Sequence, residues 1–341
     1  MKRLFVLSVL VLSFLLGNPA LSADDPKWIE AYKKGDYLTA VKELTTVAER
    51  GSAHAQYNLG VMHLEGLGTA QNFDKALLWT RLSAEQGYAD AQHNLGVMYR
   101  EGKGVARDNK AAFQWYKLSA EQGYVLAQSS LGNLYLNGQG VAQDLEQALK
   151  WTKLAADKGD LIAQSNLGGM YQLGQGVTQS DKTALKWYQR AARKGLAEAQ
   201  FNLGNLHFKG QGVSQNYKTA IKWYTMAARQ GHVIAQKNLS SVHYSGLGIP
   251  QDFDTAVKWA KLAAEQGDAS AQYNLGLIYG EAEGGSQDLL RAYMWWSFAA
   301  DQGENNAVKN LDYTKSLLSA SELKEAKKLA EECLTKNYKG C

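Results

Sequence analysis

Apolar and small residues recur along the chain at helical spacing, in short stretches that are separated by glycines. In the stretch DAQHNLGVMYREG these positions are Ala91, Leu95, Met98 and Tyr99. In the stretch NKAAFQWYKLSAEQG they are Ala111, Trp115, Leu118 and Ala120. Steps of three and four are typical of one face of an amphipathic helix. Gly102 and Gly104 lie between the two stretches and suit a tight turn with positive φ. The pattern therefore predicts two helices joined by a short turn.

This two-helix pattern returns at a fixed step of 36 residues. Tryptophan marks the step at Trp79, Trp115, Trp151, Trp187, Trp223, Trp259 and Trp295. Glycine marks it at Gly51, Gly87, Gly123, Gly159, Gly195, Gly231, Gly267 and Gly303. One helix pair cannot bury its apolar face alone, so neighbouring pairs must stack. We expect an all-α protein, an α/α solenoid with the two-helix repeats arranged as a right-handed superhelix.

The ends of the array depart from the pattern, as capping units do. We expect a degenerate N-terminal capping repeat over 24–50 and C-terminal capping helices over 303–341. Ser319 and Glu322 predict a capping box at the start of the last helix. The seven full repeats between the caps are 51–86, 87–122, 123–158, 159–194, 195–230, 231–266 and 267–302.

Residues 1–23 have the pattern of a cleavable secretory signal peptide. Lys2 and Arg3 precede an apolar run from Leu4 to Leu16, and small residues then allow cleavage after Ser22 or Ala23. The run is shorter than the ~20 residues that span a bilayer, and no later segment is apolar enough to do so. We expect the protein to be exported without stable insertion into a membrane. The periplasm is the favoured destination, and the extracellular medium is the alternative.

Charge and cysteine usage narrow the function classes. The chain has 37 Lys and Arg against 33 Asp and Glu, and two of the basic residues lie in the leader. The remaining net charge is +2 without long runs of like charge, which does not favour nucleic-acid binding. Cys333 and Cys341 are the only cysteines. In an oxidising compartment we expect them to form a disulfide, which requires the chain to leave its helix near Asn337 and fold back through Gly340.

Three patterns suggest chemistry but have simpler interpretations. His63, His207 and His243 occupy a slot that elsewhere holds tyrosine, so packing is favoured over a metal site formed by His207 and His243. Ser321 and Lys324 match Ser-x-x-Lys, yet they fall in the capping turn. The GQGV and GKGV stretches lack the further residues of phosphate-binding loops. We therefore expect no enzyme, no cofactor and no metal.

The repeated motifs A-x-A-Q-x-N-L-G-x-x-Y, G-x-G-V-x-Q and A-x-K-W-Y-x-x-A-A-x-x-G resemble the Sel-one-like repeat family, a relative of the tetratricopeptide repeat, over residues 51 to 303. The resemblance implies an α/α solenoid that mediates protein–protein contacts, often as an exported adaptor. Cysteine-rich members are linked to β-lactam binding or hydrolysis, but this chain lacks one cysteine pair per repeat. Departures from the motif include Ser240 for the helix glycine, Ser130 for the asparagine and Ala282 for a loop glycine, with Gly284 retained.

One asparagine position recurs on the first helix of seven units. This asparagine ladder is Asn58, Asn94, Asn166, Asn202, Asn238, Asn274 and Asn310, and it is interrupted at Ser130. Asparagine is a poor helix former, so the position has either a structural role or a binding role. In the binding interpretation, amides on the concave face hydrogen-bond the backbone of an extended peptide. Diversified groove positions would read its side chains: His54, Tyr57, His93, Arg100, Phe201, Lys237, Tyr244 and Tyr273.

We therefore expect an exported scaffold or adaptor that binds a protein or an extended peptide in the groove. The alternative is a hydrolase acting on β-lactams or cell-wall material, which only the family resemblance suggests. A carbohydrate or cell-wall binder would need exposed tryptophans, and seven of the nine lie at the repeated position. The oligomeric state stays open.

Overall fold

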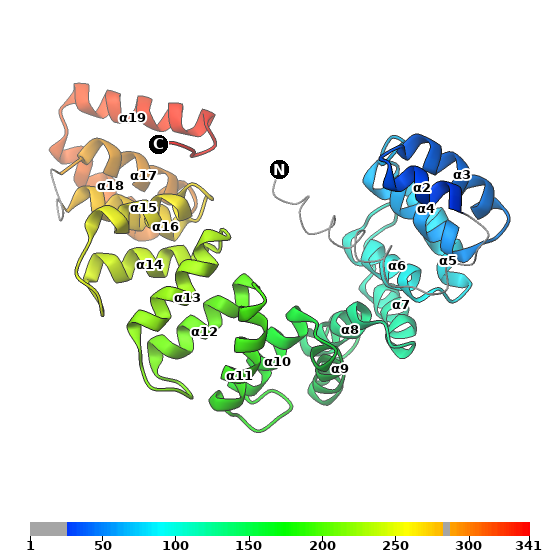
Figure 1. Cartoon of the computed structure of the whole chain (residues 1–341). Helices are drawn as coiled ribbons and strands as arrows, with labels where there is room; N and C mark the ends of the chain where they lie inside the picture. The colour runs from blue at the N-terminus through cyan, green and yellow to red at the C-terminus, as the bar shows by residue number, and fades with distance from the viewer. Residues whose placement is uncertain (1–25, 282–286) are drawn as a thin grey trace. The chain divides into compact units, whose positions relative to one another are not determined.

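The computed structural model describes residues 26–281 and 287–341 and places them in helices, with no strand in those ranges (Figure 1). This confirms the predicted all-α architecture of consecutive helix pairs. The described residues divide into two compact units, with the boundary between Trp151 and Thr152, inside one helix. The predicted leader, Ala282 and Gly284 lie outside the described residues. No helix of the described ranges is long and apolar enough to cross a membrane.

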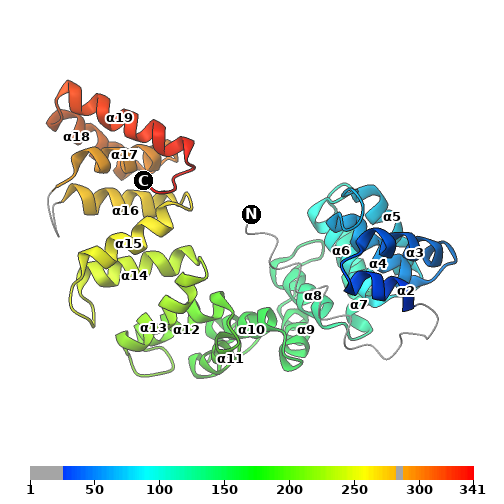
Figure 2. The same cartoon turned by 45° about the horizontal axis from the view of Figure 1, so that its top comes forward.

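Helices follow one another with short connections throughout each unit (Figures 1 and 2). The N-terminal unit holds α2 (Pro26–Lys33), α3 (Tyr37–Glu49), α4 (Ala53–Glu65), α5 (Phe73–Glu85), α6 (Ala89–Glu101), α7 (Asn109–Glu121) and α8 (Val125–Asn137). Helix α9 (Leu145–Asp157) contains the boundary. The C-terminal unit continues with α10 (Leu161–Leu173), α11 (Asp181–Arg193), α12 (Ala197–Lys209), α13 (Tyr217–Arg229), α14 (Val233–Ser245) and α15 (Phe253–Ala264). It ends with α16 (Ala269–Gly280), α17 (Leu289–Asp301), α18 (Asn305–Leu317) and α19 (Ala320–Thr335).

The paired glycines of a turn have two different roles, as Gly102 and Gly104 show. The first, such as Gly102, caps the first helix of a repeat in the left-handed region, with φ of 71°, where a side chain would be strained. The second, such as Gly104, also has positive φ and lies against the preceding repeat. A Cβ atom there would overlap the backbone carbonyl of Phe73. The turn is therefore also a contact between neighbouring repeats.

A third glycine lies inside the first helix of most repeats and faces a large ring on the second. A Cβ atom at Gly204 would lie 2.7 Å from the ring of Tyr224, much closer than van der Waals contact allows. Gly96 and Gly168 meet Tyr116 and Tyr188 in the same way. The ring of one helix fills the space that a missing side chain leaves on the other, and small alanines complete these cores.

Buried glutamines join successive helix pairs, a role that the sequence analysis did not assign. They are Gln56, Gln92, Gln128, Gln164, Gln200, Gln236 and Gln272. Each donates its amide to the carbonyl of an alanine eight residues earlier, near the end of the preceding helix, at 3.0–3.3 Å. Each of these carbonyls also accepts from the backbone of the glycine that follows its helix, as Ala192 does from Gly195 at 3.1 Å. The glutamine is therefore a second donor, supplied by the repeat that covers the helix end.

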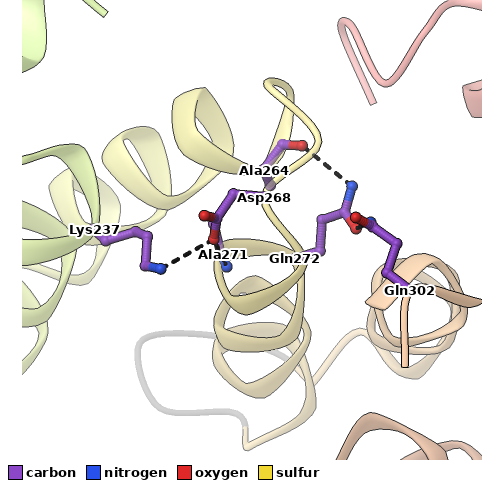
Figure 3. Close-up of polar contacts among 6 residues, drawn as sticks. All are labelled: Lys237, Ala264, Asp268, Ala271, Gln272 and Gln302. Carbon is purple, nitrogen blue, oxygen red and sulfur yellow. Dashed lines mark hydrogen bonds and ion pairs between the residues drawn. The ribbon is translucent and has the colours of Figure 1, made fainter. Parts of the chain in front are cut away.

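A second glutamine completes this contact in five places. Gln86, Gln122, Gln230, Gln266 and Gln302 each donate to the side-chain oxygen of a buried glutamine 30 residues earlier, at 2.7–2.8 Å. Figure 3 shows the chain of contacts from Ala264 through Gln272 to Gln302. The 36-residue step of both glutamines was visible in the sequence, but their contact required the packed helices.

The C-terminal cap has the predicted capping box and disulfide. The Ser319 side chain accepts from the backbone of Glu322, and the Glu322 side chain accepts from the backbone of Ser319. Helix α19 ends at Thr335, and Asn337 then adopts positive φ, so the chain turns back. Cys333 and Cys341 form a disulfide with their Cα atoms 5.7 Å apart. The chain leaves its helix where the sequence placed the departure.

The glutamine contact predicts a stabilising substitution at Lys194. Gln164 Oε1 is buried without a hydrogen-bond partner, and Lys194 occupies the position that Gln230 holds one repeat later. The backbone angles of Lys194 and Gln230 agree within 2°. We expect Lys194→Gln to form the missing bond and raise the free energy of unfolding by about 0.5–1.5 kcal/mol, measured by urea denaturation. Lys186→Gln, an exposed change on the same helix, is the control, and equal effects of both would contradict the explanation.

Candidate peptide-binding surface

Several asparagines of the ladder make hydrogen bonds within the protein, which supports a structural role for them. Asn58 Nδ2 donates to the backbone oxygen of His54 at 2.8 Å, one turn earlier on α4. Asn202 Nδ2 lies 3.5 Å from Glu198 Oε1 on α12. Asn94 hydrogen-bonds the hydroxyl of Tyr57 on the preceding repeat. Asn166 is also engaged, and Asn310 is half-buried on α18.

Asn238 shows the most informative of these contacts. The Tyr224 hydroxyl donates to Asn205 Oδ1 at 2.7 Å and also hydrogen-bonds Asn238 on the next first helix. Burial raises the pKa of Tyr224 to about 12, and the bond to Asn238 acts against that rise. Ser130, where the asparagine is missing, makes the equivalent bond to Tyr116. At these two repeats the ladder position holds the tyrosine of the preceding helix.

Asn274 differs from these asparagines. Its side chain is exposed and makes no side-chain hydrogen bond within the described ranges. The tyrosine that Asn238 bonds is replaced by alanine at the equivalent position, Ala260. Asn274 is therefore a ladder position whose amide is available to a ligand.

A cavity of about 200 Å³ opens beside Asn274, between α14 and α16. Its polar lining consists of Lys237, Ser240, Ser241, Tyr244, Asn274 and Glu281. Its apolar lining consists of Ala260, Ala271, Leu277 and Ile278. Three groove residues predicted from the sequence therefore come together here, whereas Ser240, Ser241 and Ala260 were not predicted. The sequence feature that could have identified Ser240 and Ala260 is their departure from the residues found at the same positions of other repeats.

Two polar contacts fix the walls of this cavity. Lys237 Nζ lies 3.1 Å from Asp268 Oδ1, and Asp268 also caps α16 by accepting from the Ala271 backbone at 2.8 Å (Figure 3). The Tyr244 hydroxyl donates to Glu281 Oε2 at 2.9 Å. The lysine and the tyrosine are thus held at the edges, and the space between them stays open.

A second polar cluster lies in the N-terminal unit, on α4, α6 and the turns before α6 and α8. Tyr88 contacts the rings of His54 and Tyr57, at centroid distances of 6.0 and 5.3 Å. His93 contacts Tyr124 at 5.4 Å. Tyr88 and Tyr124 were missed in the sequence analysis, although they are separated by one repeat length and directly follow the repeated glycine.

Asp90 lies within this second cluster with 8% of its surface exposed. Its side chain is hydrogen-bonded by Tyr124, but Oδ1 is buried without a partner. Burial raises the pKa of Asp90 to about 6, because the charged carboxylate is poorly solvated there. Burial also lowers the pKa of His93 to about 4. A pKa of about 6 means that the Asp90 carboxyl group changes its charge two units above the ordinary range of an aspartate.

The remaining predicted groove residues do not join either site. Arg100 pairs with Glu101 at 3.3 Å. Phe201 stacks on His232, with the ring centroids 4.6 Å apart, and His232 bonds Glu198 at 3.1 Å. The backbone oxygen of Tyr273 accepts from the indole of Trp296. The predicted groove residues therefore make separate local contacts rather than one continuous surface. Lys237 and Tyr244 are the two of them that line the cavity beside Asn274.

The residues weighed for chemistry have structural surroundings. His63, His207 and His243 each have a buried Nδ1 atom without a partner, and burial lowers the pKa of all three. The described ranges contain no group of three or more potential ligands that could hold a metal ion. Ser321 Oγ lies 3.1 Å from Ser319 Oγ, in the capping turn. Most of the repeated tryptophans pack against core clusters, namely Trp79, Trp115, Trp151, Trp223, Trp259 and Trp295.

The buried carboxyl group predicts a measurable pH dependence. A carboxyl group whose pKa is higher in the folded than in the unfolded state stabilises the fold below pH ~4, and this contribution is lost as the pH rises through about 6. We expect Asp90→Asn to raise the free energy of unfolding by on the order of 2 kcal/mol at pH 7 and by little at pH ~4. Denaturation at several pH values measures this. Asp74→Asn, an exposed change, is the control, and a pH-independent effect of Asp90→Asn would contradict the assignment.

Comparisons with known proteins agree with the repeat architecture. The Sel1 repeat model matches seven consecutive stretches: 53–88, 89–124, 125–160, 161–196, 197–232, 233–268 and 269–304. These stretches begin two residues after the boundaries that the sequence analysis set. A search of curated proteins finds no match.

Two solved structures illustrate the similarity. A Sel1 repeat protein from Oxalobacter formigenes is 33% identical, with a TM-score of 0.66, and the match covers 69% of this chain and 94% of that one. The protein c5321, a protective antigen present in uropathogenic Escherichia coli strains that displays an SLR fold, is 29% identical with a TM-score of 0.47, over 91% of this chain and 85% of that one. With seven repeat matches over most of its length, the chain belongs to the Sel1 repeat family.

Proposed function

We propose that this protein is an exported, non-enzymatic scaffold that binds an extended peptide segment of a partner protein on the first helices of its repeats. The Sel1 repeat fold is generally a protein–protein interaction scaffold. The observation that carries the finer proposal is the cavity between α14 and α16, where Lys237, Tyr244 and Asn274 lie together. Export is part of the proposal and is supported by the leader-like pattern of residues 1–23.

The cavity has the properties that peptide recognition requires. Asn274 presents an amide that can both donate to and accept from a peptide backbone. Leu277 and Ile278 supply apolar surface beside it, so a partner side chain can be buried while its backbone is held. Lys237 and Glu281 place opposite charges in the lining. Such a combination of apolar surface and a few convergent polar groups is typical of binding sites.

A peptide-display selection on the purified chain without residues 1–23 tests this function. We expect selected peptides to bind with measurable affinity, and the double variant Lys237→Ala/Asn274→Ala to weaken them by about ten-fold or more, equivalent to about 1.4 kcal/mol. Isothermal titration calorimetry provides the affinities. The matched control is Lys222→Ala/Asn305→Ala, two exposed positions outside the cavity.

Two results would refute the proposal. One is a selection that yields no peptide binding to the folded chain. The other is a set of peptides whose affinity the double variant leaves unchanged, because those peptides would bind elsewhere. Circular dichroism of both variants establishes that they remain folded.

A further inference from the structure

The cavity occupies a place where four of the other six repeats carry a large ring. The position on the second helix is Thr80, Tyr116, Thr152, Tyr188, Tyr224, Ala260 and Trp296 in successive repeats. Ala260 is the smallest side chain of this series. The facing position on the first helix is glycine in the other six repeats and serine at Ser240. Both members of the glycine–ring pair have therefore changed in one repeat.

Tyr224, the counterpart of Ala260 in the preceding repeat, shows how a ring is bound at this position. Its ring lies against Gly204, and ring centroids of Phe201 and Phe208 are 5.9 and 6.2 Å away. Its hydroxyl bonds Asn205 and Asn238. The ring is thus enclosed by neighbouring side chains while its polar end meets two amides.

The five positions that surround Tyr224 have counterparts around the cavity, one repeat later along the chain. The residues 36 positions after Phe201, Gly204, Asn205, Phe208 and Asn238 are Lys237, Ser240, Ser241, Tyr244 and Asn274. All five of these line the cavity, as does Ala260, the counterpart of Tyr224. The cavity is therefore the ring site of this repeat without its own ring.

We propose that this cavity binds the tyrosine side chain of a partner peptide, with the phenol ring displaced from the Cβ atom of Ser240 and the hydroxyl at the two polar positions that meet the hydroxyl of Tyr224 one repeat earlier. This inference rests on the proposed function and specifies the side chain that the partner supplies. Ser241 and Asn274 then meet the phenol hydroxyl, as Asn205 and Asn238 meet the hydroxyl of Tyr224.

The size and polarity of the cavity favour a phenol over other side chains. Apolar cavities of about 150 Å³ bind benzene, so about 200 Å³ accommodates one substituted ring. Ser241 and Asn274 are exposed and make no side-chain hydrogen bond within the described ranges. A phenylalanine or leucine side chain would leave both groups without the partner that a hydroxyl supplies.

Ser240 and Ala260 are compatible with each other but not with an internal ring. A Cβ atom at Gly204 would lie 2.7 Å from the ring of Tyr224, and Ser240 carries such an atom. Tyrosine at 260 alone would meet this atom, whereas glycine at 240 would make room for it. The double variant Ser240→Gly/Ala260→Tyr therefore rebuilds the pair found in the preceding repeat and fills the cavity.

Three amino-acid amides provide the direct test on the chain without residues 1–23. N-acetyl-tyrosinamide, N-acetyl-phenylalaninamide and N-acetyl-leucinamide are titrated while NMR monitors the side-chain amide of Asn274. We expect the tyrosine amide to bind about ten-fold more tightly than the phenylalanine amide, as for one hydrogen bond of about 1.4 kcal/mol. The leucine amide should bind most weakly. Equal binding of all three, or no binding, would overturn the proposal.

Two variants test whether the tyrosine amide binds in this cavity. The filled variant Ser240→Gly/Ala260→Tyr should weaken binding of the tyrosine amide by about ten-fold or more, and its unchanged affinity would overturn the proposal. The variant Ser241→Ala/Asn274→Ala should remove the preference for tyrosine over phenylalanine without filling the cavity. Its matched control is Ser316→Ala/Asn305→Ala, at exposed positions of α18 outside the cavity.

The peptide selection separates this inference from the function on which it rests. Selected peptides should contain a tyrosine whose replacement by phenylalanine weakens binding. Peptides that depend on Lys237 and Asn274 but contain no tyrosine would overturn the inference and leave the function standing. A selection without any binding peptide would refute the function, whatever the amides do.

Discussion

The array depends on satisfying the buried end of each second helix. When one repeat covers the next, the last carbonyls of a helix leave water, and an unpaired buried carbonyl costs free energy. The backbone of the following glycine donates to one such carbonyl, as Gly195 does to Ala192, and the buried glutamine of the next repeat adds a second donor, as Gln200 does for Ala192. A second glutamine, such as Gln230, then satisfies its side-chain oxygen. Because the bonds of the buried glutamines connect one repeat to the next in all seven repeats, they favour the same residue type at the same step, which is consistent with the regular spacing of the chain.

The second constraint is the close approach of the two helices within a repeat. Gly204 has no side chain because the ring of Tyr224 occupies that space, and close-packed interiors leave few voids larger than a water molecule. Replacing both partners, as at Ser240 and Ala260, leaves a cavity in an otherwise repeated core. A local departure from the repeat thus creates a concave site without altering the spacing of the array.

The asparagine ladder shows how far pattern reasoning extends. Its regular step was evident, but the step did not reveal whether the side chains face a ligand or the protein. The structure shows internal partners for Asn58, Asn202 and Asn238 and leaves the amide of Asn274 open to the cavity. The difference between Asn238 and Asn274 arises from the residue fourteen positions earlier, which is Tyr224 in one case and Ala260 in the other. A single position on one helix therefore has different roles in different repeats.

The sequence by itself determined the helical class, the 36-residue repeat, the capping box and the cysteine pair, because these depend on local spacing and on short stretches of chain. Only the tertiary structure decided which polar groups are buried and what they bond. Gln56 and Asn58 stand two positions apart in one motif, yet Gln56 is buried against the preceding helix and Asn58 is bonded within its own. The burial of Asp90 and the cavity beside Asn274 were likewise decided by packing. The physical reason is that burial and hydrogen-bond partners are set by neighbouring repeats, which lie close in space but far apart along the chain.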